Sequence, residues 1–193
     1  MRLHRFRKFF SLYGADSEAL IFYMRDESED AALEGTRFEI RKKYWQFALP
    51  DIQAAHTDTG AFTNVTGSKS NWLSGFFGFG GCHIDCVANF DCARVEMYIG
   101  TNDKALNKKL FDTVVANKVK VEATMGTTVL WDRGDDKKSS KIYVELNGVS
   151  VNIEADWPRM RKFHAEMSRK IYDAIVPYIL TEFKTGQCSV LNK

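Results

Sequence analysis

The chain has 193 residues, of which 45% are hydrophobic and 13% aromatic, a composition typical of a folded protein rather than a disordered one. Its formal net charge is only +2, so composition alone does not indicate a nucleic-acid-binding protein. We find no apolar run of the roughly 18–20 residues that a membrane span needs. The basic start of the chain also lacks the apolar stretch of a secretion signal. We therefore expect a cytoplasmic protein without a membrane partner, whose four cysteines are reduced thiols.

The start of the chain differs in composition from the rest. We interpret residues 1–35 as an N-terminal appendage, residues 36–185 as a single α+β domain and residues 186–193 as a frayed tail. Within the appendage, the apolar run at residues 19–24 fits either a strand or a buried helical turn, because periodicity cannot separate the two at this length.

The first clear helix is expected to begin at Thr36. Thr36 and Glu39 have capping-box spacing, in which the threonine oxygen accepts an early helix N–H and the glutamate reaches back. Pro50 lacks an N–H, so it should end or kink this helix near Leu49. Residues 57–75 are rich in Thr, Asn, Ser and Gly and predict a long loop.

Three strands are expected next, at residues 72–79, 82–88 and 93–99. Apolar and polar side chains alternate along the second and third of these, which is typical of a half-buried antiparallel hairpin. Residues 89–92 would form its turn. A helix at residues 103–125 should follow, capped by Thr101 or Asn102 and ended by Gly126.

The last third of the chain predicts a short strand at residues 129–131, a hairpin and a long helix. The hairpin would pair residues 142–146 with 149–153 around Asn147-Gly148, a strong short-range hairpin signal. The helix would start near Trp157-Pro158 and bury an apolar stripe. The predicted fold is therefore α+β, with a mostly antiparallel sheet of about five or six strands packed against about three helices.

Cys82, His83 and Cys86 are close enough in sequence to suggest a metal site. On a strand, however, the two cysteines point to one face and His83 to the other. A zinc site needs four convergent ligands. We therefore expect buried, reduced cysteines and no bound metal.

Asp85 and Glu96 are the candidate catalytic residues. The predicted turn places them directly opposite each other, where like charges are unfavourable unless a cation lies between them. One interpretation is a metal-dependent nuclease, because restriction-type nucleases carry an acidic residue on one strand and Glu-x-Lys on the next, and paired carboxylates can hold Mg²⁺. Here Tyr98 stands where that lysine would be. The interpretation we favour is a solvated sheet face without a cofactor, neutralised by Arg94 or a nearby lysine.

Basic side chains recur on the N-terminal arm and on two of the expected helices. Together with exposed aromatic residues they could bind DNA or RNA through its phosphates. Solvated helix faces explain them equally well. The candidate nucleic-acid-binding residues are Arg5, Arg7, Lys8, Lys108, Lys109, Arg161 and Lys162.

An ordered set of short motifs covers residues 40–180. Its members are Tyr44-Trp45, Asn71-Trp72-Leu73, Val95 to Ile99, Phe111, Lys118 to Gly126, Trp131, Ile142 and Asp156-Trp157-Pro158. In this order the chain resembles a bacterial and archaeal family known as domain of unknown function 4268. Members of that family often follow a restriction-endonuclease-like domain in proteins associated with DNA metabolism or phage defence, and the resemblance implies such a context here. It implies no catalytic residues, because none is established for the family.

The leading hypothesis is a non-catalytic binding or interaction module associated with nucleic-acid metabolism or phage defence. The first alternative is the metal-dependent, restriction-like nuclease using Asp85 and Glu96, which would need Mg²⁺. The second alternative is a module that binds a protein partner and does not contact nucleic acid. The order of elements also suits a restriction-endonuclease-like core, as an analogy at the level of the fold.

Overall fold

The structure is a computed structural model that describes the backbone of residues 17–190 and the side chains of residues 35–182. The chain divides into two compact units, Met1–Glu39 and Ile40–Lys193. Nearly all of the described side chains belong to the second unit, which also contains the whole sheet. The candidate residues Arg5, Arg7 and Lys8 lie outside the described residues.

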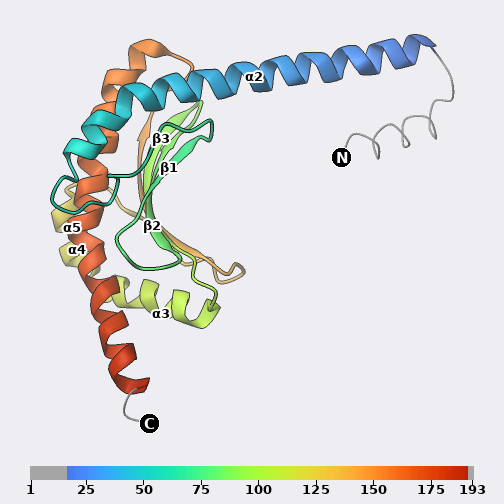
Figure 1. Cartoon of the computed structure of the whole chain (residues 1–193). Helices are drawn as coiled ribbons and strands as arrows, with labels where there is room; N and C mark the ends of the chain where they lie inside the picture. The colour runs from blue at the N-terminus through green and yellow to red at the C-terminus, as the bar shows by residue number, and fades with distance from the viewer. Residues whose placement is uncertain (1–16, 191–193) are drawn as a thin grey trace. The chain divides into compact units, whose positions relative to one another are not determined.

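A single antiparallel sheet of five strands forms the centre of the second unit (Figure 1). Its spatial order is β1-β2-β3-β5-β4, so that β5 lies between β3 and β4. The strands are β1 Trp72–Gly75, β2 Cys82–Ala88, β3 Cys92–Ile99, β4 Leu130–Asp132 and β5 Ser140–Asn147.

Four α-helices and one short 3₁₀ helix complete the described elements. They are α2 Ser17–Ala54, α3 Lys104–Val115, α4 Lys118–Met125, the 3₁₀ helix Glu154–Asp156 and α5 Trp157–Val190. The α+β class predicted from the sequence is thereby confirmed. Within residues 17–190, none of the helices is sufficiently long and apolar to cross a membrane.

The core lies between one face of the sheet and the helices. Figure 1 shows α5 running along one side of the sheet, and α5 packs on both β2 and β3. Alternate residues of the central strands supply the sheet's side of the core, and they are all buried: Cys82, Ile84, Cys86, Ala88, Ala93, Val95, Met97, Ile99, Ile142 and Val144. The period of two in these strands therefore sends the intervening side chains to the opposite face, which we call the polar face.

The first helix of the described residues, α2, is longer at both ends than predicted. It begins at Ser17, so the prediction of a start at Thr36 was wrong, and the apolar run at residues 19–24 is helical. Pro50 lies inside α2, which continues to Ala54. The capping-box spacing at Thr36 misled the prediction because a continuous helix already supplies the acceptors of the N–H groups there.

The helix predicted at residues 103–125 is two helices. Asp103, rather than Thr101 or Asn102, caps α3, and its carboxylate accepts hydrogen bonds from the backbone N–H groups of Ala105 and Leu106. Asn117 interrupts the run with φ −110° and ψ 18°. Gly126 ends α4 as predicted, in the left-handed conformation that favours glycine (φ +64°).

The hairpin predicted around Asn147-Gly148 does not form. Gly148 does turn the chain, with φ +69°, but residues 149–153 leave the sheet. β3 occupies one edge of β5 along its whole length, and β4 pairs with the other edge at residues 141–143, the far end from the turn. Val149 and Val151 pack into the core instead.

Candidate functional site

Two neighbouring rows of side chains cross the polar face of the sheet at its centre. In the first row Asp85 of β2 lies directly opposite Glu96 of β3, as the turn length predicted. Ser74 of β1 pairs with Asp85 on the other side. In the next row His83 pairs with Tyr98, and Tyr98 pairs in turn with Lys141 of β5. The register therefore brings residues from β1, β2, β3 and β5 onto one surface.

A pocket of about 420 Å³ is hollowed into this surface. It opens on the polar face and is bounded by residues of four strands and of the segment that precedes β1. Its lining residues are Asn71, Trp72, His83, Asp85, Val87, Arg94, Glu96, Tyr98 and Lys141. Such a concave site with converging polar groups is the usual location of a ligand site.

Glu96 lies on the floor of the pocket with two cations beside it. Its side chain is only 3% exposed. Lys141 donates a hydrogen bond from Nζ to Glu96 Oε1 over 2.7 Å, and Arg94 Nε lies 2.9 Å from Oε2. The carboxylate is therefore neutralised within the sheet, which is what a buried charge requires.

Asp85 has a separate set of partners on the other side of the pocket. Ser74 donates to Asp85 Oδ1 over 2.5 Å, and His83 Nε2 lies 3.2 Å from Oδ2. Each carboxylate of the pair is thus held by its own neighbours, Asp85 towards β1 and Glu96 towards β5. This arrangement relieves the like-charge repulsion that their pairing would otherwise cause.

Aromatic rings surround the two carboxylates. His83 and Tyr98 stack with ring centroids 4.7 Å apart and an interplanar angle of 24°. Lys141 Nζ lies 5.7 Å from the centre of the Tyr98 ring. Trp72 is 51% exposed at the rim of the pocket, and Phe76, which contacts His83, is 61% exposed. Large exposed aromatic side chains beside a pocket are characteristic of contact surfaces for a ligand.

Cys82 and Cys86 lie on the opposite face of β2, buried in the core as free thiols. Burial raises the pKa of Cys82 to about 11 and also raises the pKa of Cys86. Both are therefore unreactive thiols at neutral pH, and the prediction of their burial is confirmed. Among the described residues there is no group of three or more His, Cys, Asp or Glu side chains that could hold a metal ion.

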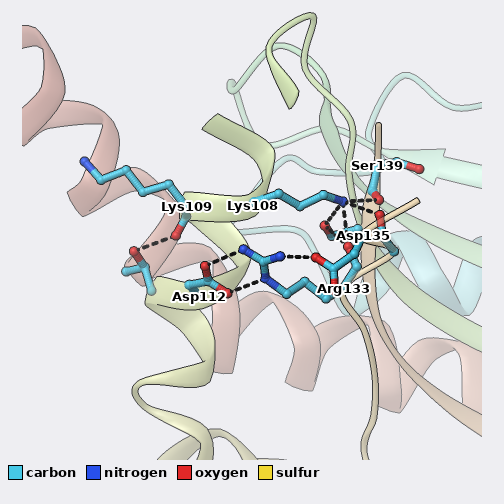
Figure 2. Close-up of polar contacts among 9 residues, drawn as sticks. Lys108, Lys109, Asp112, Arg133, Asp135 and Ser139 are labelled. Carbon is cyan, nitrogen blue, oxygen red and sulfur yellow. Dashed lines mark hydrogen bonds and ion pairs between the residues drawn. The ribbon is translucent and has the colours of Figure 1, made fainter. Parts of the chain in front are cut away.

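Lys108 is a buried residue whose ammonium group is bound to the protein itself (Figure 2). Its Nζ lies 2.6 Å from the carbonyl oxygen of Arg133, 2.8 Å from those of Gly134 and Ser139, and 3.0 Å from the hydroxyl of Ser140. Desolvation is the main reason that its pKa is lowered. An ammonium with three hydrogens and four such acceptors has no donor left for a phosphate.

The other three described basic candidates are more exposed. Lys109 forms an ion pair with Glu182, and its side chain is 64% exposed. Arg161 pairs with Asp51 over 3.0 Å, and Lys162 of α5 lies 3.7 Å from Glu166. None of these three residues lines the pocket. Their role in nucleic-acid binding stays a prediction.

Sequence reasoning missed Trp72, Ser74 and Lys141 as parts of the site. The alternation of β1 and β5 could have placed each of them on the polar face. What it could not show is that β5 lies beside β3, because the pairing joins residues that are 41 to 55 positions apart in the sequence. Lys141 is the nearby lysine that the solvated interpretation required for Glu96, and it approaches from the next strand.

The fold and the pocket define an α+β protein with a candidate ligand site on the open face of an antiparallel sheet. Residues 40–179 match the model of the family described as domain of unknown function (DUF4268). Because this match covers most of the chain, the protein belongs to that family. No curated protein and no solved structure matches the chain with significant similarity.

Proposed function

We propose that this protein is a non-catalytic module that binds single-stranded nucleic acid on the polar face of its sheet. The observation that carries the proposal is the pocket of about 420 Å³, which the half-exposed Trp72 lines together with Arg94 and Lys141. The biological context that we propose for this binding is nucleic-acid metabolism or phage defence.

The aromatic side chains support a single strand rather than a duplex. Proteins that bind single strands stack unpaired bases on exposed rings and follow the backbone with cationic groups. Open antiparallel sheets are one of the surfaces used for this purpose. Trp72 and Phe76 provide exposed rings at one side of the polar face, and Tyr98 lies nearer its centre.

The charges of the pocket support binding without cleavage. Asp85 and Glu96 are each engaged by neighbouring side chains, with which a bridging metal ion would have to compete. Arg94 Nη1 is 3.9 Å from Glu145, and the Arg94 side chain is 25% exposed. A guanidinium at the rim can therefore reach a phosphate while its Nε remains beside Glu96.

Replacing Trp72 with alanine should weaken binding to single-stranded DNA or RNA by about 1–3 kcal/mol, or roughly 5- to 150-fold, because a stacked base loses its ring. Fluorescence anisotropy of a labelled oligonucleotide at two salt concentrations measures this. Affinity should also fall as salt rises, since phosphate contacts release counterions.

Val119→Ala is the matched control, because Val119 is 81% exposed on α4 and does not line the pocket. This variant should bind like the parent. Absence of any binding at low salt would remove the proposal and favour the module that binds a protein partner. An equal loss in both variants would show that the pocket is not the binding surface.

A metal-dependent nuclease is the second candidate, and Lys141 favours it. The register pairs Lys141 with Tyr98, so a lysine ammonium lies beside the position that Glu-x-Lys would occupy. A lysine there would stabilise charge that develops on the phosphate, and a divalent ion would bridge the carboxylates of Asp85 and Glu96.

We expect no cleavage, because both carboxylates are already engaged by neighbouring side chains. The assay is incubation of plasmid and single-stranded DNA with Mg²⁺ or Mn²⁺, with an Asp85→Asn, Glu96→Gln double variant as control. Cleavage by the parent that disappears in the double variant would establish the nuclease and overturn the non-catalytic assignment.

A further inference from the structure

We propose that the bound strand runs extended along β1 and stacks every second base on a ring, one base on Trp72 and the next but one on Phe76. This inference rests on the proposed function and adds the conformation of the ligand and its shortest length, three nucleotides. It is carried by the exposure of the two rings and by their spacing of four positions along the edge of the sheet.

Trp72 and Phe76 lie on the same face of the sheet. Trp72 opens β1 and Phe76 directly follows its last residue, Gly75, and residues at i and i+4 of a strand point the same way. Trp72 lines the pocket, and the Phe76 ring lies 5.6 Å from the ring of His83, which lines the pocket as well. The two side chains are 51% and 61% exposed. Rings this exposed beside a pocket mark a contact surface.

The end of β1 holds the second ring in a fixed position. The backbone N–H of Phe76 donates to the carbonyl oxygen of Ala61 over 2.8 Å. Gly75 packs so closely on Phe62 that a side chain at position 75 would collide with that ring. Since a strand rises about 3.4 Å per residue, positions 72 and 76 are about 14 Å apart. The fold therefore sets the distance between the two rings before any ligand binds.

This distance matches two steps of an extended strand. Neighbouring bases are about 3.4 Å apart when stacked and roughly twice as far apart when the strand is extended. One extended step therefore covers only half of the distance between the rings, whereas two steps cover it. The side chain midway between the rings on this face is Ser74, which offers no surface for stacking. The middle base thus has no ring, and the two outer bases are the ones that stack on the protein.

Each ring also shares a row of the sheet with a cation. Trp72 is in the row of Arg94, two strands away. His83, the residue that Phe76 contacts, is in the row of Lys141. The row between these two carries both carboxylates of the site, which repel a phosphate. The phosphates of the ligand are therefore attracted to the two rows that hold the rings.

The test uses the full chain and DNA decamers that are abasic except for two thymidines, which are separated by none, one, two or three abasic positions. All of these decamers carry the same backbone charge. We expect the tightest binding when one abasic position separates the thymidines. Its affinity should exceed that of a decamer with a single thymidine by roughly 5- to 150-fold, the contribution of one further stacked base. Adjacent thymidines should bind like a single one, because their bases cannot reach both rings.

Phe76→Ala is the diagnostic variant, and Val119→Ala is its control. Without the second ring, all decamers with two thymidines should bind alike, whereas the control should keep the parent's preference. Binding of the single-thymidine decamer through Trp72 reports that the Phe76 variant is folded.

Equal affinity of the parent for all separations, or a maximum at another separation, would overturn the inference and leave the proposed function standing. Retention of the preference in Phe76→Ala would also overturn it. Failure of the parent to bind an all-thymidine decamer would instead refute the proposed function.

Discussion

Replacing Lys108 with methionine should lower the free energy of unfolding by about 3 kcal/mol, because it leaves the hydrogen-bond acceptors of the ammonium group without a donor. Three of those acceptors are backbone carbonyls of the segment that joins β4 to β5, as Figure 2 shows. Methionine keeps most of the aliphatic stem and removes only the charge and its donors. Urea denaturation followed by circular dichroism measures the change.

Lys109→Met is the matched control from the next position of the same helix. The Lys109 side chain is 64% exposed and its ion pair is with Glu182, so its replacement should cost under about 1 kcal/mol. An equal, small effect in both variants would show that the Lys108 contacts contribute little. Arg133 holds the same segment through Asp112, with Nε and Nη2 2.8 and 2.9 Å from its carboxylate oxygens, and should keep the Lys108 variant folded.

The pairing of Asp85 with Glu96 could be predicted from the sequence because it depends on local features. β2 and β3 both alternate with a period of two, and a short turn at Asn89 to Asp91 joins them. Once the turn length is known, the register of an antiparallel pair follows. The position of the two carboxylates opposite each other could therefore be predicted from the sequence.

The remainder of the site depends on pairings between distant segments. Lys141 reaches Glu96 only because β5 inserts between β3 and β4. The local signal at Asn147-Gly148 instead predicted that β5 would pair with the segment that follows it. Turn chemistry describes how the chain reverses, but the free edge that a strand can join is decided by the whole sheet.

The same distinction explains the helix boundaries. The chain carries capping-box spacing at Thr36 and a proline at position 50, yet α2 runs through both. Capping signals specify where a helix is able to begin, but they do not require it to begin there. At Gly126 the helix does end where the glycine signal predicts, and the predicted end of the helix is confirmed.

Two separate buried histidines, His164 and His56, make the stability of this protein sensitive to mild acid. His164 is fully buried on α5, with Nδ1 2.7 Å from the hydroxyl of Tyr44 and Nε2 3.1 Å from the carbonyl oxygen of Val87. The neutral ring satisfies both contacts when Nε2 donates to Val87 and Nδ1 accepts from Tyr44. Desolvation lowers the pKa of His164 to about 4, and burial likewise lowers the pKa of His56 to about 4.

The free energy of unfolding should therefore fall as the pH is lowered from about 6.5 to about 4, with His164 alone accounting for about 3 kcal/mol. The unfolded chain binds a proton at each ring below pH 6.5, whereas the folded chain excludes it until about pH 4, so stability is fully present above this window. Urea denaturation at a series of pH values measures the slope of the unfolding free energy against pH.

His164→Gln is the control variant. The glutamine side chain can accept from Tyr44 and donate to Val87 but does not titrate, so this slope should fall by about one proton while His56 still contributes. Carboxylates with a lowered pKa, such as Asp112, lose their contribution only below about pH 4 and do not enter this window. A slope that is the same in the parent and in His164→Gln would show that the folded protein accommodates a charged ring at this position.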